Sequence, residues 1–505
     1  MARRRYTGPF AMDLFRPLER DGAVLLSDQL ADRIRQMVAT GRLKTGDYLP
    51  PIRLVAAKLR INVGTVAKAY DVLRRQDAIA ADSTRGLRLR ADSSTSPLQT
   101  GARPWAGAVM QPVIPLDPLS VDLPVVTSSP IIRFHVSEPG TDLMPTELVT
   151  RAFGVALRQA ENLRYAPLPG LDDTRTAVAE YLRQRDVALA GAEIILTTGT
   201  TQSLAIITRA LLPAGGVVLT EHPTWHVALS IFAAAGARVI AMPVDNGGMQ
   251  VAGLADAVLR HNPAFVYIQP SFQNPTGTTL APGRRHELLA IAGKFQLPIV
   301  EDDFGGDLTF GRPSPSLRTP EGAAVVIHLK SFAKLISPAL RVGVIVAPTR
   351  YVRVFSHVKH GLDPFVSAIA QRALTECLRS GEFHRHVVAM SHSLEQRWRA
   401  LEAALRRHMP TGVRWTTPAG GLCAWLELPS RIRPRDFIRD ATRHGVQLSP
   451  GRLFCVDESG DHGLRLAFAA ITPDEINRGI RILGDLLKSR ARPQRSERLP
   501  RAVAP

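Results

Sequence analysis

Residues 325–346 read VVIHLKSFAKLISPALRVGVIV. The apolar runs at both ends of this stretch have the length and the β-branched content of buried strands. The loop between them carries the hydroxyl of Ser331, the amine of Lys334 and the guanidinium of Arg341. One strand–loop–strand junction therefore gathers three groups that can bind a ligand. Lys330, at the end of the first run, lies in the strand and is not part of this group.

Similar apolar runs recur between residues 131 and 487 and alternate with helical stretches. They cover residues 194–196, 217–219, 239–241, 265–268 and 299–300. This alternation predicts an α/β domain around a largely parallel or mixed sheet. We therefore place the main domain at residues 131–487.

Polar segments follow three of these strands, at the edge where α/β sheets bind ligands. Glu-Asp-Asp at 301–303 presents carboxylates, Gln-Asn-Pro-Thr-Gly at 273–277 forms a polar turn, and Thr-Thr-Gly-Thr-Thr-Gln at 197–202 leads into a helix. Amides and hydroxyls at a helix N-terminus can hold a phosphate. Taken singly, each segment is more often a turn or a helix cap, but their order along the chain favours a site.

The segments supply what pyridoxal phosphate chemistry needs. That cofactor takes a lysine for its aldehyde, a carboxylate for its ring nitrogen and donors for its phosphate. Residues 93–487 contain four lysines: Lys294, Lys330, Lys334 and Lys359. Because Lys334 alone stands beside a hydroxyl and an arginine in one loop, it is the candidate for the aldimine.

Residues 13–90 form a separate helical unit by pattern. Short helices are expected at about 53–59 and 65–76, and residues 78–81 and 87–90 read as two short strands. Two helices joined by a short turn and followed by a hairpin describe a winged helix-turn-helix, whose second helix fits the DNA major groove. The alternative is a small helical domain with a solvated basic face.

Candidate DNA contacts lie on the outer face of the second helix, on the helix before it and in the hairpin. They are Arg53, Asn62, Thr65, Lys68 and Arg85. Threonine and lysine suit contacts to phosphates or base edges, and a hairpin arginine suits the minor groove or the backbone.

The net charge of +18 concentrates at the two ends of the chain. Residues 1–92 hold 18 basic and 10 acidic side chains, whereas residues 93–487 hold 39 and 34. The last stretch, 488–505, holds 6 basic side chains and 1 acidic one, and we expect this tail to be disordered. Residues 91–130, rich in proline and serine, read as a semi-stiff linker. The distribution suits a polyanion-binding end on a nearly balanced body.

Three cysteines, Cys377, Cys423 and Cys455, are too far apart for a disulfide framework or a metal cluster, so we expect no metal site and a reducing compartment. The apolar runs are too short to cross a bilayer, and no signal peptide is visible behind the N-terminal arginines. The expected location is the cytoplasm.

The N-terminal unit resembles the GntR-type winged helix. Leu-Ala-Asp-Arg-Ile at 30–34, the stretch 41–50 with its Gly-Asp and Leu-Pro pairs, and Thr-Val-Ala-Lys-Ala-Tyr at 65–70 carry the resemblance. By this resemblance Arg53, Thr65 and Lys68 would be DNA contacts. The hairpin lacks the family's usual Gly-rich tip.

The main domain is similar to the fold-type I aminotransferases of class I/II. The shared motifs appear in order at residues 165–170, 198–202, 221–225, 274–277, 301–303, 331–334 and 464–466. The resemblance implies that Lys334 binds the cofactor's aldehyde, Asp302 its ring nitrogen and Asn274 its ring hydroxyl. Trp225 would stack on the ring, and the phosphate would be held by Thr200, Thr201, Ser331 and Arg341. Arg465 would bind the carboxylate of an effector or substrate.

One departure concerns the residues after Asp303. The family usually places there a tyrosine whose hydroxyl reaches the cofactor's ring oxygen, but this chain has Phe304, Gly305 and Gly306. Because that hydroxyl helps to set the proton affinity of the bonded cofactor, the departure weakens the expectation of efficient turnover and leaves that of cofactor binding unchanged.

Together the two units resemble the MocR-type (GabR-like) transcriptional regulators. The resemblance implies a homodimer that binds a DNA operator, takes up pyridoxal 5'-phosphate and senses an amino compound that displaces Lys334. A working aminotransferase with a DNA-binding appendage is the first alternative. A DNA-binding protein with an inactive pocket is the second.

Overall fold

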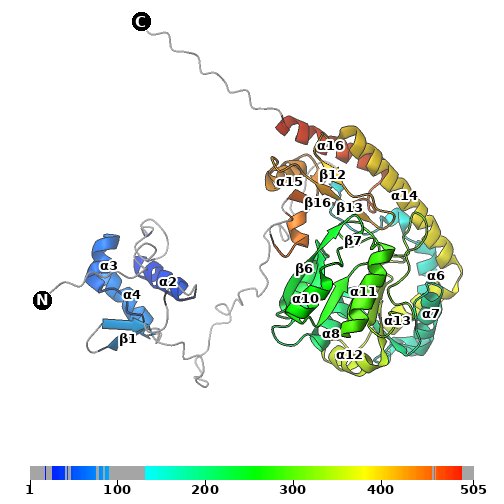
Figure 1. Cartoon of the computed structure of the whole chain (residues 1–505), viewed down its shortest axis with the longest axis horizontal. Coiled ribbons are helices and arrows are strands. Elements are labelled where there is room, and N and C mark those ends of the chain that lie inside the picture. Colours follow the sequence, from blue (N-terminus) through cyan, green and yellow to red (C-terminus); the bar gives the residue numbers. More distant parts are fainter. Residues whose placement is uncertain are drawn as a thin grey trace, which may run out of the picture. The chain divides into compact units, whose positions relative to one another are not determined.

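The computed structural model describes residues 18, 25–39, 43, 47–75, 79–82, 86–89, 131–457, 460 and 462–491. The chain divides into two compact units, residues 1–109 and 110–505, which are drawn in Figure 1. The expected linker, most of the expected tail and Arg85 lie outside the described residues.

The described residues of the smaller unit form three helices and a hairpin. Its elements are α2 (Leu26–Ala39), α3 (Ile52–Leu59), α4 (Val63–Arg75), β1 (Ile79–Asp82) and β2 (Gly86–Leu89). The strands pair antiparallel, with Ile79 opposite Leu89. Leu30, Val55 and Val66 bring the apolar faces of the three helices into one core, and the Tyr70 hydroxyl donates to the Pro50 carbonyl at 2.9 Å. This arrangement confirms the predicted winged helix-turn-helix.

The larger unit is built on an eight-stranded mixed sheet. Its strands are β4 (Ala192–Thr197), β5 (Val217–His222), β6 (Arg238–Asp245), β7 (Gly248–Met249), β8 (Phe265–Ile268), β9 (Ile299–Asp303), β10 (Val326–Ser331) and β11 (Gly343–Pro348). They lie in the order β4-β11-β10-β9-β8-β5-β6-β7. The neighbours from β10 to β6 are parallel, and β11 runs antiparallel to both β10 and β4. The sequence prediction of an α/β domain with a mixed sheet is confirmed.

Helices cover both faces of this sheet because the side chains of each strand alternate between them. Val218 packs on one side with helices α8 (Thr200–Leu211), α9 (His226–Ala234) and α12 (Thr349–Leu362). Val217 and Leu219 pack on the other with α10 (Leu254–His261) and α11 (Pro282–Phe295). The apolar strand side chains next to α6 (Thr146–Leu157), α7 (Asp172–Arg183) and α13 (Ala368–Arg379) form the largest core cluster.

The C-terminal part adds a second sheet and three helices. The sheet has the order β12 (Arg414–Trp415), β13 (Cys423–Glu427), β16 (Gly463–Ala467) and β15 (Ser449–Pro450). The long helix α14 (Glu382–His408) packs along α16 (Pro473–Ala491) at the outside of this part, and α15 (Pro434–Arg443) lies beside α16 (Figure 1). Strand β3 (Ile132–Arg133) pairs with β14 (Val446–Gln447), so the segment that follows it lies near β15 and β16. Among the residues that the structure describes, no helix is long and apolar enough to cross a membrane.

Candidate cofactor and DNA sites

One cavity of about 320 Å³ collects all the side chains that the sequence assigned to a cofactor or to a carboxylate. They are Thr200, Thr201, Trp225, Asn274, Asp302, Ser331, Lys334, Arg341 and Arg465. Most come from the C-terminal ends of the strands of the large sheet and from the loops that follow, whereas Arg465 comes from β16 of the second sheet. Residues far apart along the chain, such as Thr200 and Arg465, thus line one space.

Asp302, near the end of β9, is buried and has one free oxygen. Its Oδ2 accepts hydrogen bonds from the Tyr267 hydroxyl at 2.7 Å and from Gln269 Nε2 at 2.8 Å. Its Oδ1 is also buried, and no described residue donates to it. Burial raises the pKa of Asp302 to about 6, although the two hydrogen bonds oppose the rise. The free Oδ1 therefore suits a cationic N–H donor in the cavity.

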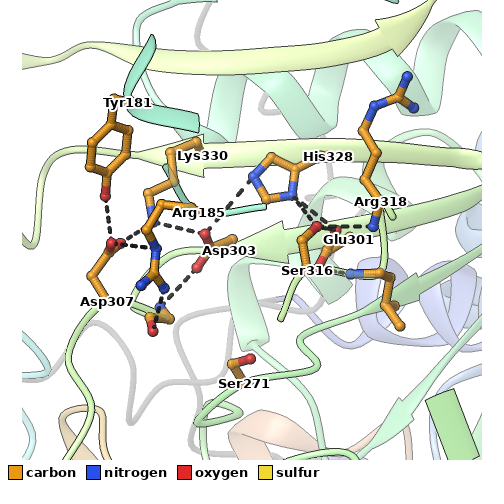
Figure 2. A network of polar contacts seen from close by, with 12 residues as sticks. Tyr181, Arg185, Ser271, Glu301, Asp303, Asp307, Ser316, Arg318, His328 and Lys330 are labelled. Atoms are coloured by element: carbon orange, nitrogen blue, oxygen red, sulfur yellow. Dashed lines mark hydrogen bonds and ion pairs between the residues drawn. The ribbon is translucent and has the colours of Figure 1, made fainter. Parts of the chain in front are cut away.

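The two lysines of the 325–346 stretch differ in their surroundings. Lys330 Nζ is buried and donates to Asp303 Oδ2 at 2.7 Å and to Asp307 (Figure 2). These carboxylates raise the pKa of Lys330 against the effect of burial. The sequence pattern did not reveal these partners, because Asp307 contacts Lys330 from the loop after β9.

Lys334 has the opposite setting. It lines the cavity and makes no hydrogen bond with any described residue. Burial lowers the pKa of Lys334, with help from Arg465 and Arg341, while Glu138 opposes the shift. A lysine amine becomes a nucleophile only when it loses its proton. Lys334 is therefore the lysine suited to bond with an aldehyde, and Lys330 is held as an ion pair.

The start of helix α8 offers a phosphate site. Gly199 precedes the helix with φ +126°, and a Cβ there would lie 3.3 Å from Arg341 Nη2, so the guanidinium lies against the first turn. Thr200 Oγ1 is buried and has no partner among the described residues. Free backbone N–H groups, an unpaired hydroxyl and an arginine at a helix N-terminus fit a phosphate.

Arg465 is a buried cation held only by neutral groups. Its Nη1 donates to Asn274 Oδ1 at 3.1 Å, and its Nη2 donates to the His135 carbonyl at 2.7 Å and to Ser449 Oγ at 3.1 Å. Its Nε has no partner among the described residues, and the guanidinium lies 4.9 Å from the centre of the Phe454 ring. None of the ion pairs found in the described part of the chain includes Arg465. A buried guanidinium without a counter-ion suits a ligand carboxylate.

The structure adds residues in and behind the cavity that the sequence motifs did not reveal. Tyr267 and Gln269 hold Asp302, and Glu138 and His226 line the cavity. Phe304 also lines it, at the point where the family has its tyrosine segment. A Cβ at Gly305 would meet only Leu308 Cδ1, at 3.9 Å, so there is space for a side chain at that position.

The candidate DNA contacts lie on the smaller unit. Arg53, Asn62 and Lys68 are exposed, and Thr65 is half-buried. Asn62 also has a structural role, because its Oδ1 accepts from the Gly64 N–H at 2.8 Å and so caps the start of α4. The fifth candidate, Arg85, lies outside the described residues. Exposed Arg88 on β2 is a further cation of this unit.

Comparisons with known proteins agree with both units. Residues 129–483 match the family described as aminotransferase class I and II, and residues 26–89 match the bacterial regulatory proteins of the gntR family. The uncharacterized HTH-type transcriptional regulator YisV of Bacillus subtilis (strain 168) is 27% identical over 92% of this chain and 96% of its own length. The probable rhizopine catabolism regulatory protein MocR of Rhizobium meliloti is also 27% identical, over 92% of this chain and 94% of its own.

A solved structure resembles the larger unit. LysN, the α-aminoadipate aminotransferase of Thermus thermophilus, was determined in complex with N-(5'-phosphopyridoxyl)-L-leucine. It gives a TM-score of 0.67 and 32% identity over 71% of this chain and 92% of its own. The two family resemblances drawn from the sequence are thereby confirmed.

Proposed function

Because the chain belongs to the aminotransferase class I and II family and also carries a gntR-type winged helix, we propose that it is a DNA-binding transcriptional regulator that uses pyridoxal 5'-phosphate to sense an amino acid or another amino compound. The observation that carries the proposal is the presence, in one chain, of an exposed basic recognition helix and of the cavity around Lys334. Similarity along the full length to HTH-type regulators supports it.

The residues of the cavity fit the cofactor, which supplies an aldehyde that combines reversibly with primary amines. Asp302 Oδ1 would accept from the protonated ring nitrogen, and Asn274 would reach the ring hydroxyl. Lys334 would hold the aldehyde carbon, and Trp225 would cover one face of the ring. The phosphate would be held at the start of α8 by Thr200, Thr201, Ser331 and Arg341. The support for this fit is the unpaired, buried Asp302 Oδ1 and Thr200 Oγ1.

Arg465 would bind the carboxylate of the effector. A carboxylate that accepts a hydrogen bond from Arg465 Nη1 would share that nitrogen with Asn274 Oδ1, so binding would act on a contact that already joins two cavity residues. An effector changes DNA affinity only if it binds one arrangement of the protein more tightly than another. Arg465 lies on β16 of the second sheet, and Asn274 lies in the loop after β8 of the large sheet. Their hydrogen bond therefore joins two parts of the fold, which suits the cavity to this role.

The smaller unit would carry the effector signal to DNA. We assign residues 13–90 to this DNA-binding domain, 91–130 to a linker, 131–487 to the sensing and dimerisation domain and 488–505 to a basic tail. Helix α4 would enter the major groove with Thr65 and Lys68, supported by Arg53, Asn62 and Arg85. Since such a regulator acts on the chromosome, we place its action in the cytoplasm.

We also propose a homodimer. Tyr165 is 84% exposed and its ring packs at a tilt of 32° against Phe365, whose ring centroid lies 4.7 Å away. Lys359 Nζ holds this region together by donating to the Leu168 carbonyl at 2.7 Å and to the Pro364 carbonyl. Exposed aromatic side chains on a fixed loop favour an interface. A dimer would present two winged helices to two half-sites.

The test uses the purified full chain and the DNA that precedes its own gene. Pyridoxal phosphate should give a visible absorbance band that Lys334→Ala abolishes, and amino compounds should change both this band and DNA affinity. Retention of the band in Lys334→Ala, or DNA affinity that no amino compound alters, contradicts the proposal.

An active aminotransferase is the second candidate, favoured by Lys334, Asp302 and Arg465 in one cavity. It lacks the family's tyrosine at residues 304–306. Amino-group transfer from a panel of amino acids to 2-oxoglutarate separates the two candidates. Multiple turnovers at about 1 per second or faster, typical of enzymes, would favour the aminotransferase.

A further inference from the structure

Glu138 is an acidic side chain in the cavity that none of the roles above uses. It follows strand β3, is half-buried and lines the cavity together with Lys334 and Arg465. It makes no hydrogen bond or ion pair with a described residue. Its charge nevertheless acts on the cavity, because it opposes the lowering of the Lys334 pKa.

The other charged groups of the cavity each have a complement under the proposed function. Asp302 faces the ring nitrogen, Arg341 the phosphate and Arg465 the carboxylate of the effector. Lys334 would carry no ammonium opposite Glu138 while it is joined to the cofactor. If the effector's amine displaced it, burial would lower the pKa of the freed Lys334 amine and so disfavour its ammonium form. Glu138 is then the one acidic side chain described in this cavity that has no cationic partner.

The neighbouring histidines do not provide that charge. Burial and Arg465 lower the pKa of His226 to about 4. Burial, Arg465 and Arg133 also lower the pKa of His135. Both rings are therefore neutral at pH 7. Leaving a partly buried carboxylate without a cation is unfavourable, and the cost falls when a ligand brings one.

We propose that the effector carries a second amino group, and that Glu138 selects it: the ligand class is a diamino carboxylic acid. Arg465 binds its carboxylate, one amine is directed at the cofactor, and Glu138 pairs with the distal ammonium. This inference rests on the proposed function and names the chemical class of its effector.

The experiment titrates the full-length protein, loaded with pyridoxal phosphate, with four amino acids and follows the cofactor absorbance. L-lysine and L-ornithine carry a distal ammonium, L-norleucine carries an apolar chain of similar length to lysine, and L-2-aminoadipate carries a distal carboxylate. We expect lysine or ornithine to bind at least ten times more tightly than norleucine, and 2-aminoadipate to bind most weakly.

Glu138→Gln keeps the size of the side chain and removes its charge. It should reduce the lysine-to-norleucine affinity ratio at least fivefold. The matched control is Glu180→Gln, an exposed glutamate on α7 outside this cavity, which should keep the ratio. Circular dichroism and the cofactor band report whether each variant is folded and loaded.

The outcomes separate the two claims. If none of the four amino acids changes the absorbance or the DNA affinity, the proposed function itself fails for this class of ligand and the inference fails with it. If all four bind with similar affinity, or if Glu138→Gln leaves the ratio unchanged, the sensor function stands and the role of Glu138 is overturned.

Discussion

Asp302 combines a cost in stability with the proposed role in binding the cofactor. Burial raises its pKa from 3.8 to about 6. Between these pH values the folded protein holds a proton that the unfolded chain has lost, so the contribution of Asp302 to stability falls as the pH rises. At about 1.36 kcal/mol per pKa unit, the full effect above pH 6 is up to about 3 kcal/mol.

We therefore predict that Asp302→Asn makes the cofactor-free protein more stable at pH 8. The amide oxygen can still accept from Tyr267 and Gln269, while the buried charge is removed. The gain should vanish below about pH 4, where the carboxyl group is protonated in both states. Denaturant unfolding at pH 8 and near pH 4 measures it. Added pyridoxal phosphate should stabilise the wild type and not the variant, and a variant that is less stable than wild type at pH 8 contradicts the assignment.

Tyr267 sets the pH range in which Asp302 is ionised. Its hydrogen bond lowers the pKa of Asp302 against the effect of burial. Tyr267→Phe should raise the pKa of Asp302, so the carboxylate becomes protonated at a higher pH. The loss of cofactor affinity on acidification should therefore begin at a higher pH than in the wild type. Titrating cofactor absorbance between pH 5 and 9 gives the midpoint. Tyr181→Phe is the matched control, since Tyr181 is a second tyrosine that donates to an aspartate, Asp307 at 2.5 Å. Equal midpoints in the two variants would refute the role of Tyr267.

At the scale of elements, helix α4 separates two kinds of basic side chain. Lys68 is exposed without a described partner, whereas Arg74 pairs with Asp71 at 2.8 Å. Six residues turn a helix by about 240°, so the two cations face different directions. Lys68→Ala should weaken DNA binding several-fold, and Arg53→Ala should do the same.

Salt dependence tests whether these interactions are electrostatic. Removing one cation that binds a phosphate should reduce the slope of log affinity against log salt concentration by about 1. Arg74→Ala serves as the control and should change neither the affinity nor the slope. Unchanged DNA affinity in both Lys68→Ala and Arg53→Ala would remove the proposed DNA face.

The strands could be placed from the sequence because they are apolar and punctuated by polar segments, but their register could not. Asp302 and Asp303 are adjacent on β9 and so point to opposite faces of the sheet. Which of them faces the cavity depends on the pairing of β9 with β8, where Ile268 lies opposite Glu301, so that Gln269 falls beside Asp302. The family resemblance supplied Asp302, whereas Tyr267, Gln269 and the partners of Lys330 required the three-dimensional structure.

For the whole molecule, the sequence predicted two units of different kind, and the family matches at residues 26–89 and 129–483 confirm their nature. The charge pattern alone left the N-terminal excess ambiguous, because a solvated basic face has the same composition as a DNA-binding one. The motifs resolved this ambiguity, because they place the basic residues on the helices and the hairpin of a winged helix-turn-helix. Long-range contacts such as Arg465 with Asn274 lie outside what spacing can predict.

If one chain couples its cavity to DNA, the coupling must be reciprocal. A compound that changes DNA affinity by a given factor must itself bind with an affinity changed by the same factor when DNA is bound. We predict that L-lysine, titrated by cofactor absorbance with and without saturating DNA, shows this equal shift, typically about 5- to 150-fold for allosteric proteins. In the double variant Arg53→Ala and Lys68→Ala, which should bind DNA poorly, adding DNA should leave lysine affinity unchanged. The prediction fails if lysine alters the DNA affinity of the wild type but binds equally tightly with and without DNA. Such a result would show that the two binding events are not linked in one equilibrium.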